Sequence, residues 1–338
     1  MGTYNVYGPL TNSAIKVMRK VADKKTRKLS TERQIGWLIQ QDEDLVNRLD
    51  FPIFCEEYNW KRKGRHCIFP QDSSVVDRLL SAEFESSHLD ALELPFDSFI
   101  LAMPRGYTSN GVEIPSALIT TGVFGEYGDK VMNRFCDAIG MEHPEHQFPE
   151  ELTGQSCLHL VYKDPRAPAA RMLYARASIP SSQFDDLLGT NDLDEFQAIA
   201  GNYSNSNMLN IMDNEPHDQV IQYTLLKLTL AIGVFNQATD GVHIRDGVPS
   251  SKISFIGSPS DLRPRSATLG MPDLASKGVT GDREPHYRRW HFRQLMSERY
   301  YQNEHAHRPR GSRWTFVKDA YVSGSQDSAH TAEHSDRQ

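Results

Sequence analysis

The sequence lacks the patterns that send a protein into a membrane or out of the cell. It has no run of the roughly 18 apolar residues that a transmembrane helix requires. The opening stretch MGTYNVYGPL has no apolar segment behind basic residues, and Val6 stands where a myristoylation signal has Ser or Thr. We therefore expect a cytoplasmic protein that has no membrane partner.

Cysteine is scarce, and its spacing excludes two common frameworks. The chain has Cys55, Cys67, Cys136 and Cys157, and no two of them form a CxxC pair. This spacing suits neither a zinc ribbon nor a set of disulfides, so we expect reduced thiols that are mostly buried. The phosphate-loop pattern GxxxxGK[ST], the dinucleotide pattern GxGxxG and the nucleophile pattern GxSxG are also missing. The sequence thus favours a binding protein over an enzyme, with no cofactor and no metal.

Charge is distributed unevenly along the chain. The net charge is -7, yet residues 1–30 hold seven Lys or Arg against the single Asp23. Residues 283–318 hold nine Lys or Arg against three Glu, so the middle of the chain is strongly acidic. Two interpretations remain open: the basic ends contact a polyanion or an acidic partner, or they dock on the acidic body.

Hydrophobic periodicity predicts the helices and strands. Helices are expected over residues 13–28, 30–49 (with a Thr31–Gln34 capping box), 74–84 and 125–140, and a long buried helix over 218–240. Strands are expected over 92–104, 112–124, 156–164 and 170–179. In the first strand, alternation would place Leu92, Leu94, Phe96, Ser98 and Ile100 on one face. The polar composition of residues 181–215 indicates a loop or lid, and that of 245–282 a long exposed linker.

These elements predict an α+β fold: a mixed sheet with N-terminal helices, a long central buried helix and a C-terminal basic strand pair that returns to the sheet. We divide the chain into a basic helical region (1–85), a main α/β domain (86–322) and a disordered tail (323–338). The main domain ends in a unit rich in His and Arg (283–322). Within residues 181–215, the Asn-rich stretch 200–215 could form a lid over a peptide-binding groove.

The stretch HYRRWHFRQL in this C-terminal unit contains the candidate binding residues. Arginine pairs with phosphate and aromatic rings stack on unpaired bases, so these residues suit RNA contact. The candidates are His286, Arg288, Arg289, Trp290, His291 and Arg293, with Arg313 and Trp314 further on. Equally, the arginines could pair with the acidic body and only support the fold. A metal-free ribonuclease using His286, His291 and Arg289 is a further alternative, although alternation along a strand would put the two histidines on opposite faces.

The segment PHYRRWHFR…GSRWTFVKDAYV resembles the C-terminal signature of a family of phage and mobile-element proteins. The pattern is His-x-Arg-Arg-x-His, a spacer, and a basic-aromatic strand, with His286, Arg288, Arg289, His291, Arg313 and Trp314 as its residues here. Residues 92–104 and 225–240 are similar to central pieces of the family. The resemblance covers the last two thirds of the chain in patches.

The family is the type V-A anti-CRISPR group that lowers production of a Cas effector nuclease at the level of the mRNA and nascent chain, together with its relatives. The resemblance implies a counter-defence or regulatory protein in the cytoplasm of a bacterial host. It would recognise a protein segment, such as the nascent peptide of a Cas effector, near the mRNA and ribosome. Such a binder needs a groove with apolar anchors or an exposed sheet edge.

Overall fold

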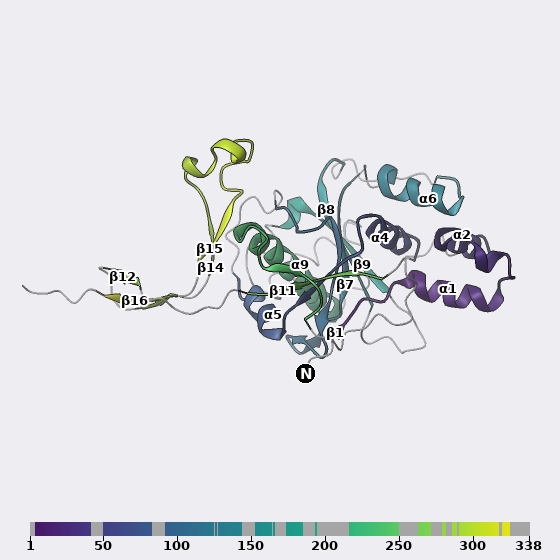
Figure 1. The fold of residues 1–338 in the computed structure, drawn as a ribbon, viewed down its shortest axis with the longest axis horizontal. Coiled ribbons are helices and arrows are strands. Elements are labelled where there is room, and N and C mark those ends of the chain that lie inside the picture. The colour runs from purple at the N-terminus through teal and green to yellow at the C-terminus, as the bar shows by residue number, and fades with distance from the viewer. Residues whose placement is uncertain are drawn as a thin grey trace, which may run out of the picture.

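The fold is built on a mixed sheet that runs through the middle of the molecule (Figure 1). The computed structural model describes residues 4–41, 50–82, 92–124, 126, 128–143, 153–163, 165, 174–184, 193–194, 216–249, 263–271, 279–281, 286–288, 291–317 and 320–324. The sheet has seven strands in the order β10-β11-β2-β3-β7-β8-β9. Their bounds are β2 (His66–Pro70), β3 (Ser98–Leu101), β7 (Ala117–Val123), β8 (Ser156–Lys163), β9 (Tyr174–Pro180), β10 (Ile244–Asp246) and β11 (Arg265–Leu269).

Strand β2 is parallel to both of its neighbours, and the other neighbouring pairs in the sheet are antiparallel. Helices cover both faces of this mixed sheet (Figure 1), so the α+β prediction is confirmed. The predicted boundary at residue 85 falls between β2 and β3, which are neighbouring strands. Strand β2 of the predicted N-terminal region therefore lies in the same sheet as strands of the predicted main domain.

One face carries α1 (Leu10–Val21), α2 (Thr31–Gln41), α4 (Asp50–Arg62) and α6 (Asn133–Ile139). Their apolar side chains pack with those strand residues that point to this side, including Cys67, Phe69 and Ile100. The basic helix predicted near the N-terminus is α1, and its exposed face carries Lys16. A π-helical turn (Gly128–Met132) precedes α6, so the helix predicted over 125–140 is regular only in its second half.

Two helix starts on this face are capped by residues that the sequence pattern does not indicate. In α2, the hydroxyl of Ser30 accepts the backbone N–H of Arg33, whereas the Gln34 amide donates back to the carbonyl of Leu29, so the Thr31–Gln34 capping box is wrong. In α1, the buried Glu57 carboxylate on α4 accepts the backbone N–H groups of Leu10 and Thr11. A side chain 46 residues away in sequence thus satisfies donors that a local cap usually takes.

The opposite face carries α5 (Ser73–Leu80) and α9 (Pro216–Ala238). Almost the whole of α9 is buried, as predicted for residues 218–240. At Gly233, an added Cβ would lie 2.9 Å from the Leu92 and Leu94 side chains, so the glycine lets residues 92–94 lie against the helix. None of the helices in the described ranges is both long and apolar enough to cross a membrane.

Residues 92–104 are not one long strand. Pairing begins only at Ser98, after the turn at residues 95–97, and β3 ends at Leu101. Leu92, Leu94 and Phe96 pack on the α9 face, whereas Ile100 points to the α4 face. The prediction that these side chains share one face is wrong, because the alternation holds only within the paired strand.

The linker predicted over 245–282 is also wrong in part. It contains β11, which runs parallel to β2 and is the second strand of the sheet. Three of the five side chains in RSATL are polar, and only Ala267 and Leu269 are buried, so its composition resembles a loop. Residues 250–262 and 272–278 lie outside the described parts of the chain.

The C-terminal strands form small ribbons of their own and do not return to the central sheet, contrary to the prediction. Strands β14 (His291–Gln294) and β15 (Trp314–Val317) pair with each other. Strand β16 (Ala320–Gly324) pairs with β12 (Val279–Gly281) and β13 (His286–Arg288), apart from the central sheet (Figure 1). The remaining short pairs are β1 (Tyr4–Asn5) with β4 (Met103–Pro104) and β5 (Thr108–Ser109) with β6 (Val112–Glu113), the latter closed by Asn110 and Gly111 in left-handed conformations.

Candidate functional site

A buried polar cluster connects β8, β9 and α4. His159 on β8 lies between Cys157 on the same face of the strand and Ser178 on the neighbouring β9. Its Nε2 lies 3.3 Å from Cys157 Sγ, and its Nδ1 lies 2.9 Å from Ser178 Oγ and 3.0 Å from Arg176 Nη2. The same Arg176 nitrogen donates to Glu56 Oε1 at 2.9 Å, which forms a buried ion pair between β9 and α4.

Arg176 decides which nitrogen of the His159 ring carries the proton. A guanidinium group can only donate, so Nδ1 must accept and the proton of the neutral ring lies on Nε2, which donates to Cys157 Sγ. Burial lowers the pKa of His159 to about 4; the Glu56 charge opposes this shift and the Arg176 charge adds to it. The ring is therefore neutral near pH 7.

This cluster resembles a Cys–His pair in composition but not in proton placement. A nucleophilic cysteine needs a base that can take its proton, and here the facing nitrogen already carries one. Burial and, next, the Glu56 charge raise the pKa of the Cys157 thiol to about 12, so the thiolate is strongly disfavoured. The arrangement stabilises the contact between α4 and the sheet and does not activate a nucleophile.

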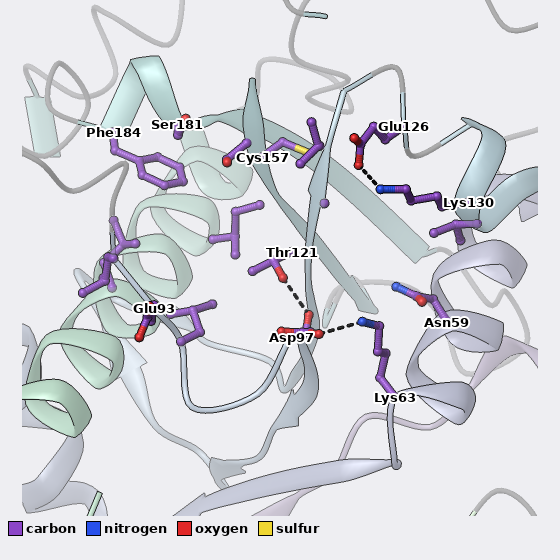
Figure 2. Close-up of a pocket in the computed structure, with 18 of the residues that line it drawn as sticks. Asn59, Lys63, Glu93, Asp97, Thr121, Glu126, Lys130, Cys157, Ser181 and Phe184 are labelled. Carbon is purple, nitrogen blue, oxygen red and sulfur yellow. Dashed lines mark hydrogen bonds and ion pairs between the residues drawn. The ribbon is translucent and has the colours of Figure 1, made fainter. Parts of the chain in front are cut away.

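Cys157 also lines the larger of two adjoining cavities, about 710 Å³ in volume. This cavity lies at the end of the sheet where β7 ends and β8 begins, so both helical layers contribute to its wall (Figure 2). Apolar side chains from α9, β7, β8, the segment before β3 and the turn after β9 form part of the wall. They are Leu92, Leu94, Val123, Leu158, Phe184 and Leu230.

Charged side chains of both signs surround this apolar surface. The Lys63 ammonium lies 2.6 Å from Asp97, and Lys130 pairs with Glu126 one helical turn away (Figure 2). Arg134 is a third basic residue in the lining, and Glu93 is a third acidic one. Glu93 also pairs with Arg308 at 3.0 Å, so the C-terminal unit reaches the rim of the cavity.

The structure separates the residues predicted from the HYRRWHFRQL stretch. His286 and Arg288 lie on β13, whereas His291 and Arg293 lie on β14, and the two strands belong to different ribbons. Arg289 and Trp290 lie outside the described residues. Arg293 is exposed. Arg313 is half-buried and donates from Nη1 to the Tyr300 carbonyl.

Trp314 is a core residue. Its side chain is 4% exposed and, with the buried Phe292 from the paired strand, belongs to the apolar core that contains α9. A ring buried in this way has no free face on which a base could stack. We therefore assign Trp314 to the attachment of the β14–β15 ribbon and no longer to a binding surface.

Sequence patterns do not single out the charged residues of the cavity. Lys63, Asp97 and the neighbouring Lys130 and Arg134 come from three separate parts of the chain, and none belongs to a known catalytic or binding motif. Two weak signals were present: the basic run KRKGR at residues 61–65, and Cys157 with His159 on one face of a strand. Neither signal indicates which other segments lie nearby.

Within the described ranges, no group of three or more His, Cys, Asp and Glu side chains is arranged to hold a metal ion. Comparison of the chain with known protein families, curated proteins and solved structures found no match.

Proposed function

We propose that the protein is a regulatory binding protein that takes a segment of another protein into the cavity at the end of the sheet. By the resemblance of its C-terminal pattern, it acts in counter-defence for a phage or mobile element in the bacterial cytoplasm. Its target is a nascent peptide, such as that of a Cas effector, and binding lowers the expression of that target.

The observation that supports this proposal is the composition of the cavity. An apolar surface with a rim of both charge signs suits a short peptide, whose apolar side chains would be buried while its polar groups pair at the edge. The neighbouring Cys157–His159 pair lacks the proton arrangement of a catalytic dyad, which favours binding over covalent chemistry.

RNA contact by the C-terminal unit is the second candidate, and the exposure of Arg293 favours it. Arg299 and Arg310 are exposed on the same unit. Basic side chains of this kind can neutralise phosphates without reading a sequence. A metal-free ribonuclease remains a variant of this candidate.

Ribosome display distinguishes peptide recognition from RNA recognition. Messages that encode random N-terminal segments are translated to stalled ribosomes, captured on the immobilised protein and sequenced. The enriched clones are then recoded with synonymous codons. If the peptide is recognised, enrichment persists after recoding. Loss of enrichment after recoding would show that the nucleotide sequence is recognised, and would support the RNA-binding candidate instead.

A pair of variants tests whether the cavity is responsible. Ser156 is exposed at the start of β8 and lines the cavity, so Ser156→Trp should fill the space with little cost to folding. Ser73→Trp adds the same ring at an exposed position outside the cavity lining. We expect Ser156→Trp to abolish enrichment and Ser73→Trp to retain it. Equal enrichment by the two variants would contradict the proposal.

A further inference from the structure

The second, smaller cavity adjoins the first and is strongly basic. Its volume is about 240 Å³, and it shares Asn59, Lys63, Lys130 and Arg134 with the larger one. Arg62 and Tyr58 also line it, and none of the described lining residues is Asp or Glu. Four cationic side chains thus surround a space large enough for one small anionic group.

Within the described parts of the chain, two of these cations have no carboxylate partner. Lys63 pairs with Asp97 and Lys130 pairs with Glu126, so their charges are partly compensated. Among the described residues, neither Arg62 nor Arg134 forms an ion pair with Asp or Glu; the Arg62 guanidinium lies 5.8 Å from the centre of the Tyr58 ring. A guanidinium group can bind a carboxylate through two parallel hydrogen bonds.

Asn59 is a second sign of a ligand site. Its side chain points from α4 into the cavity (Figure 2), and the residue is only 9% exposed. Its amide makes no hydrogen bond to any residue in the described part of the chain. A polar group this buried is normally satisfied, so a donor that faces a cavity suits an acceptor on a bound molecule.

The lining of the larger, adjoining cavity indicates what kind of anionic ligand fits. The larger cavity has three basic and three acidic side chains together with its apolar wall. An RNA strand carries a negative charge on every phosphate and would meet Glu93, Asp97 and Glu126 as well as the cations. A protein segment with one acidic side chain between apolar residues would place its carboxylate beside Arg134 and its apolar groups on the wall.

We propose that the basic cavity is a subsite for an aspartate or glutamate side chain of the bound protein segment, held by Arg134 and Asn59. The inference rests on the proposed function and deepens it, because it defines the chemistry of the segment. A segment with a neutral or basic residue at that position would bind more weakly.

Peptides provide the test. Clones enriched by ribosome display are made as synthetic fluorescent peptides, and each Asp or Glu is replaced in turn by Asn or Gln. Affinity is measured by fluorescence anisotropy against the wild type, Arg134→Gln and the control Arg105→Gln, an exposed arginine outside both cavities. One acidic position should lose about tenfold in affinity when neutralised, as expected for a charged hydrogen bond.

Comparison of the protein variants tests whether the acidic peptide side chain binds Arg134. The tenfold difference should disappear in Arg134→Gln and persist in Arg105→Gln. Peptides that bind in the cavity with no acidic preference would overturn the subsite and leave the proposed function standing. A preference that survives Arg134→Gln would also overturn it. If display enriches no peptide, the proposed function and the subsite both fail.

Discussion

At the scale of single residues, His159 makes the fold sensitive to pH. Its pKa is about 4 in the folded protein against an ordinary value of 6.5. Between these two values the unfolded chain binds a proton that the native chain does not, so stability decreases as the pH falls. The decrease begins near pH 6.5 and ends near pH 4.

His159 alone should lower the free energy of unfolding by about 3 kcal/mol across that window. His159→Asn keeps an acceptor near Arg176 but cannot be protonated in this range, so its stability should depend less on pH. Urea unfolding at several pH values measures the difference. His143→Asn, at an exposed ring, is the matched control; equal slopes for His159→Asn and the wild type would refute this role.

Residue patterns could predict the buried thiols but not the polar cluster around one of them. Four Cys residues without paired spacing predicted reduced, buried side chains, and all four are free and buried. The contact of His159 with Cys157 follows strand alternation, whereas Arg176 and Glu56 reach it through strand pairing and helix packing. Those contacts depend on tertiary structure, which the sequence pattern does not encode locally.

At the scale of elements, α2 and α6 approach each other closely at Gly36. A Cβ added there would lie 2.3 Å from the Ile139 carbonyl oxygen, which belongs to the backbone and cannot rotate away. Gly36→Ala should therefore destabilise the protein by about 1–3 kcal/mol through overpacking. Urea unfolding tests this against Gly8→Ala, where an added Cβ meets no heavy atom within 4 Å. Equal stabilities of the two variants would show that the helices can separate freely.

The β14–β15 ribbon is attached to the core through buried aromatic side chains. Trp314 is buried in the core with Phe292, so Trp314→Ala should cost about 3–5 kcal/mol or release the ribbon. Arg293→Ala, on the same ribbon but exposed, should change stability by less than about 0.5 kcal/mol. Release of the ribbon would be measured as faster hydrogen exchange of its backbone amides. Unchanged exchange in Trp314→Ala would mean that other contacts hold it.

Periodicity predicted the elements with a strong pattern and failed where backbone pairing decides. The buried helix α9 and the strand β8 appear close to their expected positions. Strand β11 was missed because three of its five side chains are polar, although its backbone pairs with β2. Residues 92–104 were predicted as one strand because their apolar side chains alternate. A turn precedes Ser98, however, so Ile100 faces the layer opposite to the one that Leu92, Leu94 and Phe96 contact.

At the scale of the whole molecule, the fold brings distant charged segments to one end of the sheet. Lys63 follows α4, Asp97 precedes β3, and Lys130 and Arg134 flank the start of α6. The C-terminal unit contacts the same region through the pair between Arg308 and Glu93. The basic run KRKGR could be seen in the sequence, but its position beside a cavity depends on the packing of both helical layers.

The most direct test of peptide binding in this cavity is site-specific photo-cross-linking. A benzophenone amino acid is placed at position 181, which lines the cavity, or at position 293 on the exposed side of the C-terminal unit. Each protein is irradiated with clones enriched by ribosome display, and the cross-linked product is identified by mass spectrometry. If the peptide binds in the cavity, position 181 should cross-link to the nascent peptide, and Ser156→Trp should abolish this cross-link. Cross-links from position 293 to RNA, with none to peptide from position 181, would contradict it.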